Sequence, residues 1–551
     1  MGRTSVTNAD EKWYRLQADG VIRYETNVNR MNIQVMAGAS QESYRYQWFS
    51  ASKLDLTSPE LTELDAATMD AAVGGNYTNW VMRSYFGRLA LNWAEKYLLE
   101  ANFRTDGSSR FAPGNTRWGY FPSFSAGWRV SEEEFLRDVL WLNSLKIRAS
   151  YGALGNNALG DNRDNDGNYS YQSLYNANNY VLNNIVQVGF AQNALSNSLL
   201  TWETTYVSNF GLDFSLFRSR LSGTVDAFVK NTTGILIDLP APLVHGASSI
   251  PKKNAAKVRN TGAEVNLTWN DRIGEVDCFV GGNFTYVKNK VTKFKGREMS
   301  ISGTNLLVEG QPIKIQYVFQ VDRIVQTAED LALVQRMVDA DPQAFASYKR
   351  PELGDFLYKD VSGLGADGLP DGIPDGKITD ADRVMAGNGT NPTTTYGFSF
   401  GAGWKGVDFS CLLQGVGGLL VNWNGGDDAG VFRPVVTYGN QINRTIADGR
   451  WYEGRPDAAT YPRLLEHADN RNSIASDFWL EDKSFLRVKN IQLGYTFPKK
   501  LSGAVKIETL RLYGSVENAL TFTKFRGLDP EVDKTAYPNL RLLTFGINLT
   551  F

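Results

Sequence analysis

The last nine residues, Leu543-Thr-Phe-Gly-Ile-Asn-Leu-Thr-Phe551, alternate strictly between apolar side chains and small polar ones. Successive side chains of a β-strand point to opposite faces, so this stretch predicts a strand with one apolar and one polar face. In a soluble sandwich the apolar face would cover a core, whereas in a membrane barrel it would face lipid. One strand does not separate the two architectures, so the rest of the chain must decide.

The same period-two pattern recurs along nearly the whole chain and predicts about fifteen strands. Apolar residues alternate with Glu, Asn, Lys and Arg, for example where Leu99 and Phe103 flank Glu100 and Asn102. Because a wet lumen or open solvent would suit these polar faces, both architectures remain possible at this point. A phase slip between Val488 and Ile491 predicts a β-bulge.

The connections between the predicted strands are either very short or very long. Tight turns are expected at residues 218–220 and 405–406, and long loops near 153–204, 291–394 and 415–484. Sandwiches have loops of similar length at both ends, whereas transmembrane barrels have short periplasmic turns and long extracellular loops. The predicted fold is therefore all-β, a large transmembrane antiparallel β-barrel.

Composition agrees with this fold and excludes some functions. Of the 551 residues 42% are hydrophobic, and the mean hydropathy is −0.31. A barrel strand faces lipid only at every second residue, so a soluble-like average does not exclude a membrane protein. Aromatic residues reach 12%, which suits the aromatic girdles of a barrel. The net charge is −2 and no run of Lys or Arg stands out, so the sequence does not indicate a basic surface that would bind nucleic acid.

Three local features lie outside the strand pattern. A helix is predicted over Ala328 to Tyr348, inside a long loop, as an extracellular ornament. Cys278 and Cys411 could pair, but small buried or lipid-facing thiols are the interpretation we favour. The first residues lack the pattern of a signal peptide, so a mature or truncated piece of an exported protein is expected.

Several stretches together resemble the SusC/RagA family of TonB-dependent outer-membrane transporters from Bacteroidetes-type bacteria. The final Phe551 also resembles the last residue of bacterial outer-membrane proteins, which helps to direct their assembly. In chain order the stretches are RTDGSSRF (104–111), WGYFPSFSAGWR (118–129), LKIRASYGALGNN (145–157), WETTYVSNFGLDFSLF (202–217), KVRNTGAEVNLTW (257–269), FLRVKNIQLGYTFP (485–498) and RLYGSVENALTFTKFRGLDPEV (511–532).

The resemblance covers residues 85–551 and implies both a function and a departure from the family. Members carry an N-terminal extension, a plug and about twenty-two strands, so residues 1–551 are expected to be the C-terminal portion of such a barrel, without the plug. The implied function is import of glycan or peptide fragments across the outer membrane. The implied partners are a SusD-like lipoprotein outside, TonB inside through the plug region, and the lipid bilayer.

Two other function classes stay open. One is a passive porin-like or structural outer-membrane barrel, and the other is an extracellular all-β adhesin. Enzymatic activity is not expected, because His245 and His467 lie in loops without a nucleophile motif nearby. No cofactor is expected, apart from a calcium ion in one acidic loop.

That loop contains Asp371, Asp375 and Asp382. Counting Asp371 as position 1 of an EF-hand-like loop puts Asp375 at position 5, Gly376 at position 6 and Asp382 at position 12. Ile373 at position 3 cannot ligate, so a Gly/Pro/Asp-rich turn is the alternative. The resemblance favours a metal, because the family often carries an Asp/Asn-Gly-Asp-Gly loop here.

Loop aromatics form a candidate substrate site. Tyr169, Tyr171, Tyr175 and Tyr180 lie among asparagines, and rings with amide donors would suit an oligosaccharide. A self-packed aromatic loop is the alternative. The charged residues predicted to face the lumen are expected to form structural salt bridges rather than to bind substrate: Arg88, Glu100, Arg104, Lys146 and Arg148.

Overall fold

The computed structural model describes residues 3–159, 167–192, 195–237, 252–295, 299–302, 305–422, 435–436, 444–454, 458–466, 471–502, 507–532 and 537–551. His245 and His467 lie outside these ranges. The chain divides into two compact units. The first contains Met1–Phe214, Asp226–Arg259 and Thr292–Gly296, and the second contains Ser215–Val225, Asn260–Val291 and Arg297–Phe551.

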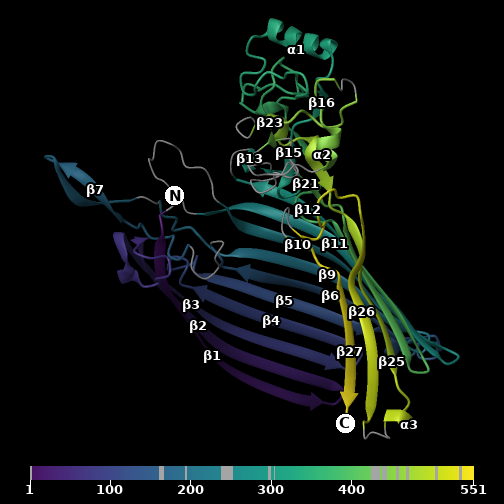
Figure 1. The fold of residues 1–551 in the computed structure, drawn as a ribbon. Helices are drawn as coiled ribbons and strands as arrows, with labels where there is room; N and C mark the ends of the chain where they lie inside the picture. Colours follow the sequence, from purple (N-terminus) through teal and green to yellow (C-terminus); the bar gives the residue numbers. More distant parts are fainter. Residues whose placement is uncertain are drawn as a thin grey trace. The chain divides into compact units, whose positions relative to one another are not determined.

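A fifteen-stranded antiparallel sheet dominates the fold and confirms the predicted class (Figure 1). Neighbouring strands follow chain order, as hairpin connections dictate. The strands are β1 (Ser5–Val28), β2 (Met31–Leu56), β3 (Ala67–Trp93), β4 (Tyr97–Ser108), β5 (Trp118–Arg129), β6 (Leu142–Asn156), β9 (Glu203–Leu216), β10 (Leu221–Ile237), β11 (Lys253–Ile273), β12 (Val276–Phe294), β19 (Thr394–Trp404), β20 (Val407–Gly417), β25 (Phe485–Thr496), β26 (Thr509–Thr523) and β27 (Leu542–Thr550).

The remaining elements lie in the connections. Among the described residues no helix is long and apolar enough to cross a membrane. The short elements are the hairpin β7 (Asn176–Leu182) and β8 (Ile185–Ala191), β13 (Met299–Ser302), β14 (Asn305–Val308), β15 (Ile315–Val318), β16 (Val321–Ile324), β17 (Phe356–Tyr358), β18 (Val384–Ala386), β21 (Leu420–Asn422), β22 (Val435–Val436), β23 (Leu465–Glu466), β24 (Leu480–Asp482), α1 (Ala328–Ala340), α2 (Arg444–Gly449) and α3 (Lys499–Ser502).

Helix α1 is shorter than the predicted 328–348. It begins with a capping box, in which Thr327 accepts from the backbone N–H of Asp330 at 3.1 Å and Asp330 reaches back to the N-cap. It ends at Ala340, because Pro342 disfavours helical geometry at the preceding Asp341, which is extended (φ −143°). The predicted helix beyond Ala340 was therefore wrong, although the Asp-Pro pair was readable in the sequence.

In the first unit, the register aligns apolar side chains into a band across β1, β2 and β3. The band covers residues 20–28, 31–39 and 85–93, close to the 9–11 residues that a tilted strand needs to cross a bilayer. Its rows, from the tight turns outward, are Val28 with Met31 and Trp93, Thr26 with Ile33 and Leu91, Tyr24 with Val35 and Leu89, Ile22 with Ala37 and Gly87, and Gly20 with Ala39 and Tyr85.

The band ends sharply on the same face. The next row places Ala18 beside Gln41 and Arg83, whose side chains hydrogen-bond at 3.0 Å. These three strands are 24, 26 and 27 residues long, so more than half of each lies beyond the band. The sequence pattern did not predict this length.

Aromatic rings mark the end of the band next to the turns. Trp93 stacks on Tyr97 at 5.4 Å between ring centroids, and Tyr97 stacks on Trp128 at 6.5 Å. The Glu133 carboxylate accepts hydrogen bonds from Tyr97 Oη (2.6 Å), Lys96 Nζ (3.0 Å) and Trp128 Nε1 (3.1 Å). These donors lower the pKa of Glu133 to about 2. Aromatic belts of this kind lie at membrane–water interfaces.

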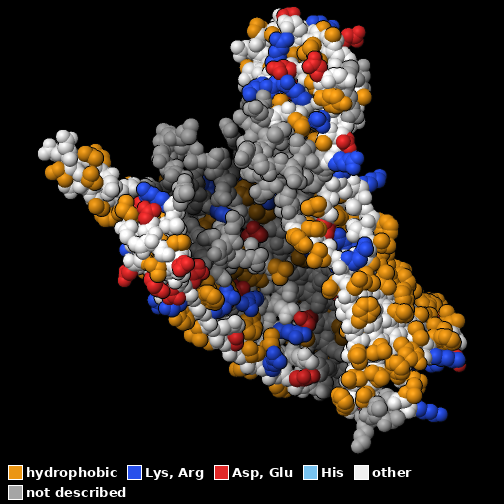
Figure 2. Space-filling view, viewed as in Figure 1, with side chains coloured by type: hydrophobic (Ala, Val, Ile, Leu, Met, Phe, Trp, Pro, Cys, Tyr) orange, Lys and Arg blue, Asp and Glu red, His pale blue; other side chains and the backbone are white. Residues whose placement is uncertain are grey.

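The second unit carries the apolar face across its strands. One row joins Cys278, Ala402, Phe409, Leu493, Gly514 and Phe545. Phe545 is 87% exposed, and hydrophobic side chains gather over β25 to β27 (Figure 2). The register shift between Val488 and Asn490 confirms the predicted bulge. Cys278 and Cys411 are both free thiols, as the favoured interpretation expected.

The apolar face predicts a position-specific cost for charge. Ile547 is 64% exposed and is the middle one of the five alternating apolar residues between 543 and 551, beside Leu512. Ile547→Arg should lower the free energy of unfolding by about 2–4 kcal/mol, because it puts a cation into hydrocarbon. Thr544→Arg, on the opposite face of the same strand, is the matched control and should cost far less. Urea unfolding in lipid vesicles measures both, and equal losses would contradict the assignment of the two faces.

Candidate functional site

The polar face of the first unit is built from ion pairs. Arg88 contacts Glu100 at 2.7 Å, and Arg148 contacts Asp213 at 2.9 Å and Asp226 at 2.7 Å. Further pairs join Arg104 to Asp106 at 2.8 Å and Lys146 to Asp213 at 3.6 Å. The predicted salt bridges of these charges are confirmed, although only Arg88 and Glu100 pair within the predicted set. Four of these side chains line a recess of about 470 Å³ together with Asn32, Gln34 and Asn209; they are Arg88, Glu100, Lys146 and Arg148.

A glycine lies beneath the Arg148 pair. A Cβ atom added at Gly211 would lie 2.5 Å from Arg148 Cζ and 2.7 Å from an Asp226 carboxylate oxygen. Arg148 belongs to β6, Gly211 to β9 and Asp226 to β10, so the ion pair crosses the middle strand over its glycine. The absence of a side chain there is what permits the contact.

The second unit repeats the arrangement independently. Asp408 on β20 meets Arg511 on β26, with Arg511 Nε 3.0 Å from a carboxylate oxygen of Asp408. Gly494 on β25 lies between them, and a Cβ there would approach both side chains to 2.5 Å. Two glycine-spanning ion pairs, far apart in the sequence, make this a recurring device of the wall. The sequence shows each glycine but not its partners.

The family-like stretches converge where β4, β5 and β6 leave the wall. Phe111, Phe121 and Trp202, from three different stretches, pack in one cluster with ring distances of 5.5 Å and 5.3 Å. Trp202 Nε1 donates to the Arg117 carbonyl at 2.9 Å. Arg110, only 3% exposed, lies 4.8 Å from the Trp80 ring. These stretches are structural: they hold the loop ends of the strands together.

Two further family-like stretches meet through buried charges. Arg487, 3% exposed on β25, contacts Asp529 and Glu531 in the connection from β26 to β27, both at 2.5 Å. Lys489 adds a contact to Glu531 at 3.0 Å. The FLRVKN and RGLDPEV stretches are therefore partners in space, which their separation in sequence concealed.

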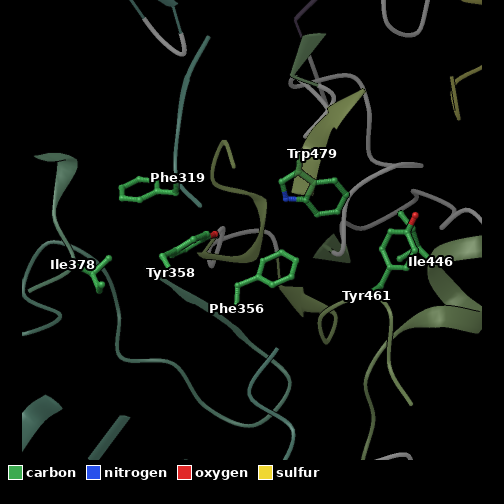
Figure 3. Packing of buried hydrophobic residues seen from close by; sticks show 7 residues of the cluster. All are labelled: Phe319, Phe356, Tyr358, Ile378, Ile446, Tyr461 and Trp479. Carbon is green, nitrogen blue, oxygen red and sulfur yellow. The ribbon is translucent and has the colours of Figure 1, made fainter. Parts of the chain in front are cut away.

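Two long connections form one body with a hydrophobic core (Figure 3). The β12–β19 connection and the β20–β25 connection both contribute; the buried members are Phe319, Phe356, Tyr358, Ile378, Ile446, Tyr461 and Trp479. Asp355, with no exposed surface, accepts from Arg463 Nε (2.7 Å), Arg471 Nη1 (3.0 Å) and Asn472 Nδ2 (3.0 Å). We call this the loop body. No local pattern in the sequence predicts it.

The four candidate tyrosines do not act as one group. Tyr169 donates to Asn79 Oδ1 at 2.9 Å and lies 6.2 Å from the Tyr171 ring, so this pair is anchored to the wall. Tyr175 directly precedes the β7–β8 hairpin and is 64% exposed, and Tyr180 lies within β7 and is 63% exposed. The exposed pair is the part that a ligand could contact, and substrate binding there stays a prediction.

In the acidic loop, each of the three candidate carboxylates accepts hydrogen bonds from backbone N–H groups. Asp371 accepts from Ile373 N at 2.9 Å and Asp375 from Lys377 N at 3.0 Å. Asp382 is fully buried and accepts from the N–H groups of Val361 (2.7 Å), Ser362 (3.0 Å) and Thr379 (2.8 Å). Burial raises the pKa of Asp382.

Within the described ranges, no three His, Cys, Asp or Glu side chains lie close enough to hold a metal ion. In the structure, Asp371, Asp375 and Asp382 instead accept hydrogen bonds from different backbone N–H groups. Calcium binding by this loop stays a prediction, and the turn interpretation explains the contacts that are present.

The apolar outer band, the ion-paired opposite face and the aromatic belt together define an outer-membrane β-barrel wall. The chain belongs to the family of TonB-dependent receptor-like β-barrels, whose family model matches residues 2–519. The resemblance to SusC and RagA is confirmed by the relatives below.

The chain is 29% identical to TonB-dependent receptor P39 of Formosa agariphila, over 98% of this chain and 53% of the relative. It is 24% identical to TonB-dependent receptor SusC of Bacteroides thetaiotaomicron, over 98% of this chain and 50% of the relative. Among solved structures, the RagAB peptide transporter matches with a TM-score of 0.76 and 24% identity, over 100% of this chain and 56% of that one. The chain thus spans about half the length of the curated relatives it matches.

The glycine-spanning ion pair predicts a specific effect of one methyl group. Gly494→Ala should separate Arg511 from Asp408 and lower the free energy of unfolding by about 1–3 kcal/mol. Gly403→Ala on β19 is the matched control, since its nearest neighbour atom would lie at 3.9 Å. Thermal unfolding in detergent compares the two, and equal melting temperatures would contradict the proposed role of Gly494.

The acidic loop predicts a local loss of stability on removal of one carboxylate. Asp382→Ala leaves three backbone donors without their acceptor, so hydrogen exchange across 360–382 should become faster by a factor of about 10 to 100. Asp367→Ala, which loses one exposed contact to Leu369 N, is the control. Exchange of the wild type is then measured with calcium and with a chelator. Protection that depends on calcium would favour the metal site, and equal protection would leave the turn alone.

Proposed function

We propose that this chain forms the barrel wall of an active importer that takes glycan or peptide fragments across the outer membrane. The observation that carries the proposal is the pairing of a lipid-facing band with an opposite face of ion pairs. Such a face leaves polar groups toward an aqueous lumen, which a large barrel encloses. Membership of the TonB-dependent receptor family supports active rather than passive transport.

The partners follow from the relatives by analogy. The relatives are about twice as long as this chain, and we propose that their additional length includes a plug on which TonB acts. A SusD-like lipoprotein on the outer surface is proposed from the likeness to SusC and to RagAB, a peptide transporter by its own description. The loop body gives such a lid a folded surface rather than loose loops.

The substrate contact is proposed at the exposed ends of the loops. The rings of Tyr175 and Tyr180 are exposed, whereas the hydroxyl of Tyr169 is hydrogen-bonded to Asn79. Exposed aromatic rings stack on sugar faces and also pack on peptide side chains, so glycan and peptide remain alternatives. Catalysis is not proposed, since the charged groups that line the recess of the first unit are engaged in ion pairs.

Uptake by the full-length parent should need TonB and the lid. In a deletion strain, the parent should restore growth on the substrate, and loss of either partner should abolish it. Residues 1–551 alone, exported behind a signal sequence, should not restore energy-dependent uptake. The measurement is accumulation of labelled substrate with and without a protonophore.

Two outcomes would contradict this proposal. Uptake that persists without TonB and with the protonophore would identify a passive porin-like barrel. Energy-dependent uptake by residues 1–551 alone would show that the proposed division between wall and plug is wrong. Surface expression of each variant, measured by antibody labelling of intact cells, is the control for both.

A further inference from the structure

The connection from β5 to β6, residues 130–141, exposes three large apolar side chains. Phe135 is 69% exposed, Leu140 is 93% exposed and Trp141 is 54% exposed. Three such residues within seven positions form more than the scattered apolar exposure of an ordinary surface. Something other than water is expected to cover them.

Several backbone N–H groups of this connection find their acceptors within it. The N–H of Glu133 donates to the Val130 carbonyl at 3.1 Å, and that of Leu136 to the Glu133 carbonyl at 3.1 Å. The N–H of Val139 in turn donates to the Leu136 carbonyl at 3.1 Å. Successive turns thus pair part of the polar backbone, which lowers the cost of placing it where water is scarce.

Glu133 fixes where the connection lies. Its carboxylate accepts from Tyr97 Oη and Trp128 Nε1, and both rings belong to the apolar face of the wall. The connection therefore starts on the lipid side, at the level of the aromatic belt. Rings of such a belt lie at the depth of the lipid headgroups.

The apolar surface continues from the belt onto the wall. On the same face, a groove of about 550 Å³ is lined by the small residues Ala101, Ala126 and Ala149 and by the larger side chains of Leu91, Leu99 and Phe124. The exposed residues of the connection thus extend a surface that the bilayer already covers. That continuity identifies lipid as the occupant.

The charges of the connection select among lipids. Glu132, Glu134 and Asp138 are exposed, and Arg137 is the only cation between residues 130 and 141. An acidic segment is repelled by anionic headgroups and is compatible with zwitterionic headgroups that carry an ammonium group. The chemistry fits an aminophospholipid surface.

We propose that residues 130–141 form a membrane-surface segment that seats Phe135, Leu140 and Trp141 in the headgroup–acyl boundary of an aminophospholipid leaflet. The segment fixes the depth of the wall at its short-turn end. This role concerns the bilayer and goes beyond transport, so it does not depend on which substrate is carried.

Spin labelling of the full chain in lipid nanodiscs tests the position. A nitroxide at Leu140→Cys, in a background with Cys278→Ser and Cys411→Ser, reports collisions with oxygen and with a water-soluble nickel chelate. The oxygen-to-nickel ratio at 140 should exceed that at Glu134→Cys by about tenfold, since apolar side chains of interfacial segments lie about 5–10 Å into the boundary. Phe135→Cys is the second reporter, in case the first variant folds poorly.

Two results would overturn the proposal. If the label at 140 collides with the nickel chelate as often as the label at 134 does, residue 140 lies in water. A label that meets neither reagent shows that protein covers it.

Lipid composition tests the headgroup preference separately. Replacing phosphatidylethanolamine with phosphatidylglycerol should lower the oxygen-to-nickel ratio at 140 by a factor of about two or more, because like charges repel at the surface. A variant with Glu132→Gln, Glu134→Gln and Asp138→Asn should lose this dependence. If the oxygen-to-nickel ratio does not change with lipid charge in either the unsubstituted segment or the triple variant, the preference for an aminophospholipid is overturned.

Discussion

Every backbone N–H and C=O inside a bilayer must find its partner within the protein, and the rest of this structure follows from that constraint. The ladder of antiparallel strands supplies the partners, and its register then decides which side chains face lipid. A slip by one residue would exchange the two faces, placing Glu100 and Arg148 in hydrocarbon. The bulge at Val488 shows how an extra residue is absorbed without that exchange.

The wall and the loop body are stabilised by different interactions. Hydrogen bonds and ion pairs dominate in the wall, and hydrophobic packing dominates in the loop body. Within the described strands of the wall, buried apolar clusters are small, as at Cys411, Val488 and Ala519. The lipid face gains little from contact with itself, so hydrogen bonds and ion pairs join the strands. The glycine-spanning pairs at Gly211 and Gly494 tie three strands at once. The hydrophobic effect operates instead in the loop body, where Phe356 and Trp479 exclude water as in a soluble domain.

Features with a local period could be predicted from the sequence, and features built from distant pairs could not. Alternation predicted the strands and the bulge, and it grouped the charges that form salt bridges on one face of the sheet. The end of α1 at Ala340 was encoded by Pro342 but was obscured by apolar residues that follow at helical spacing. The loop body escaped prediction because Asp355 and Arg463 are separated by more than a hundred residues. The carboxylates of the acidic loop had metal-like spacing, yet their contacts with nearby backbone N–H groups depend on the folded turn.

The length of β1, β2 and β3 has a consequence for how the wall is built. Only the part next to the tight turn at Asn29 carries the apolar band, so only that part gains free energy by entering lipid. The remaining residues gain only what pairing gives them, and pairing in a hairpin spreads outward from the turn with a small loss of loop entropy. Insertion into lipid and strand pairing thus start from the same point, and a hairpin that stalls halfway has already placed its apolar band in the membrane.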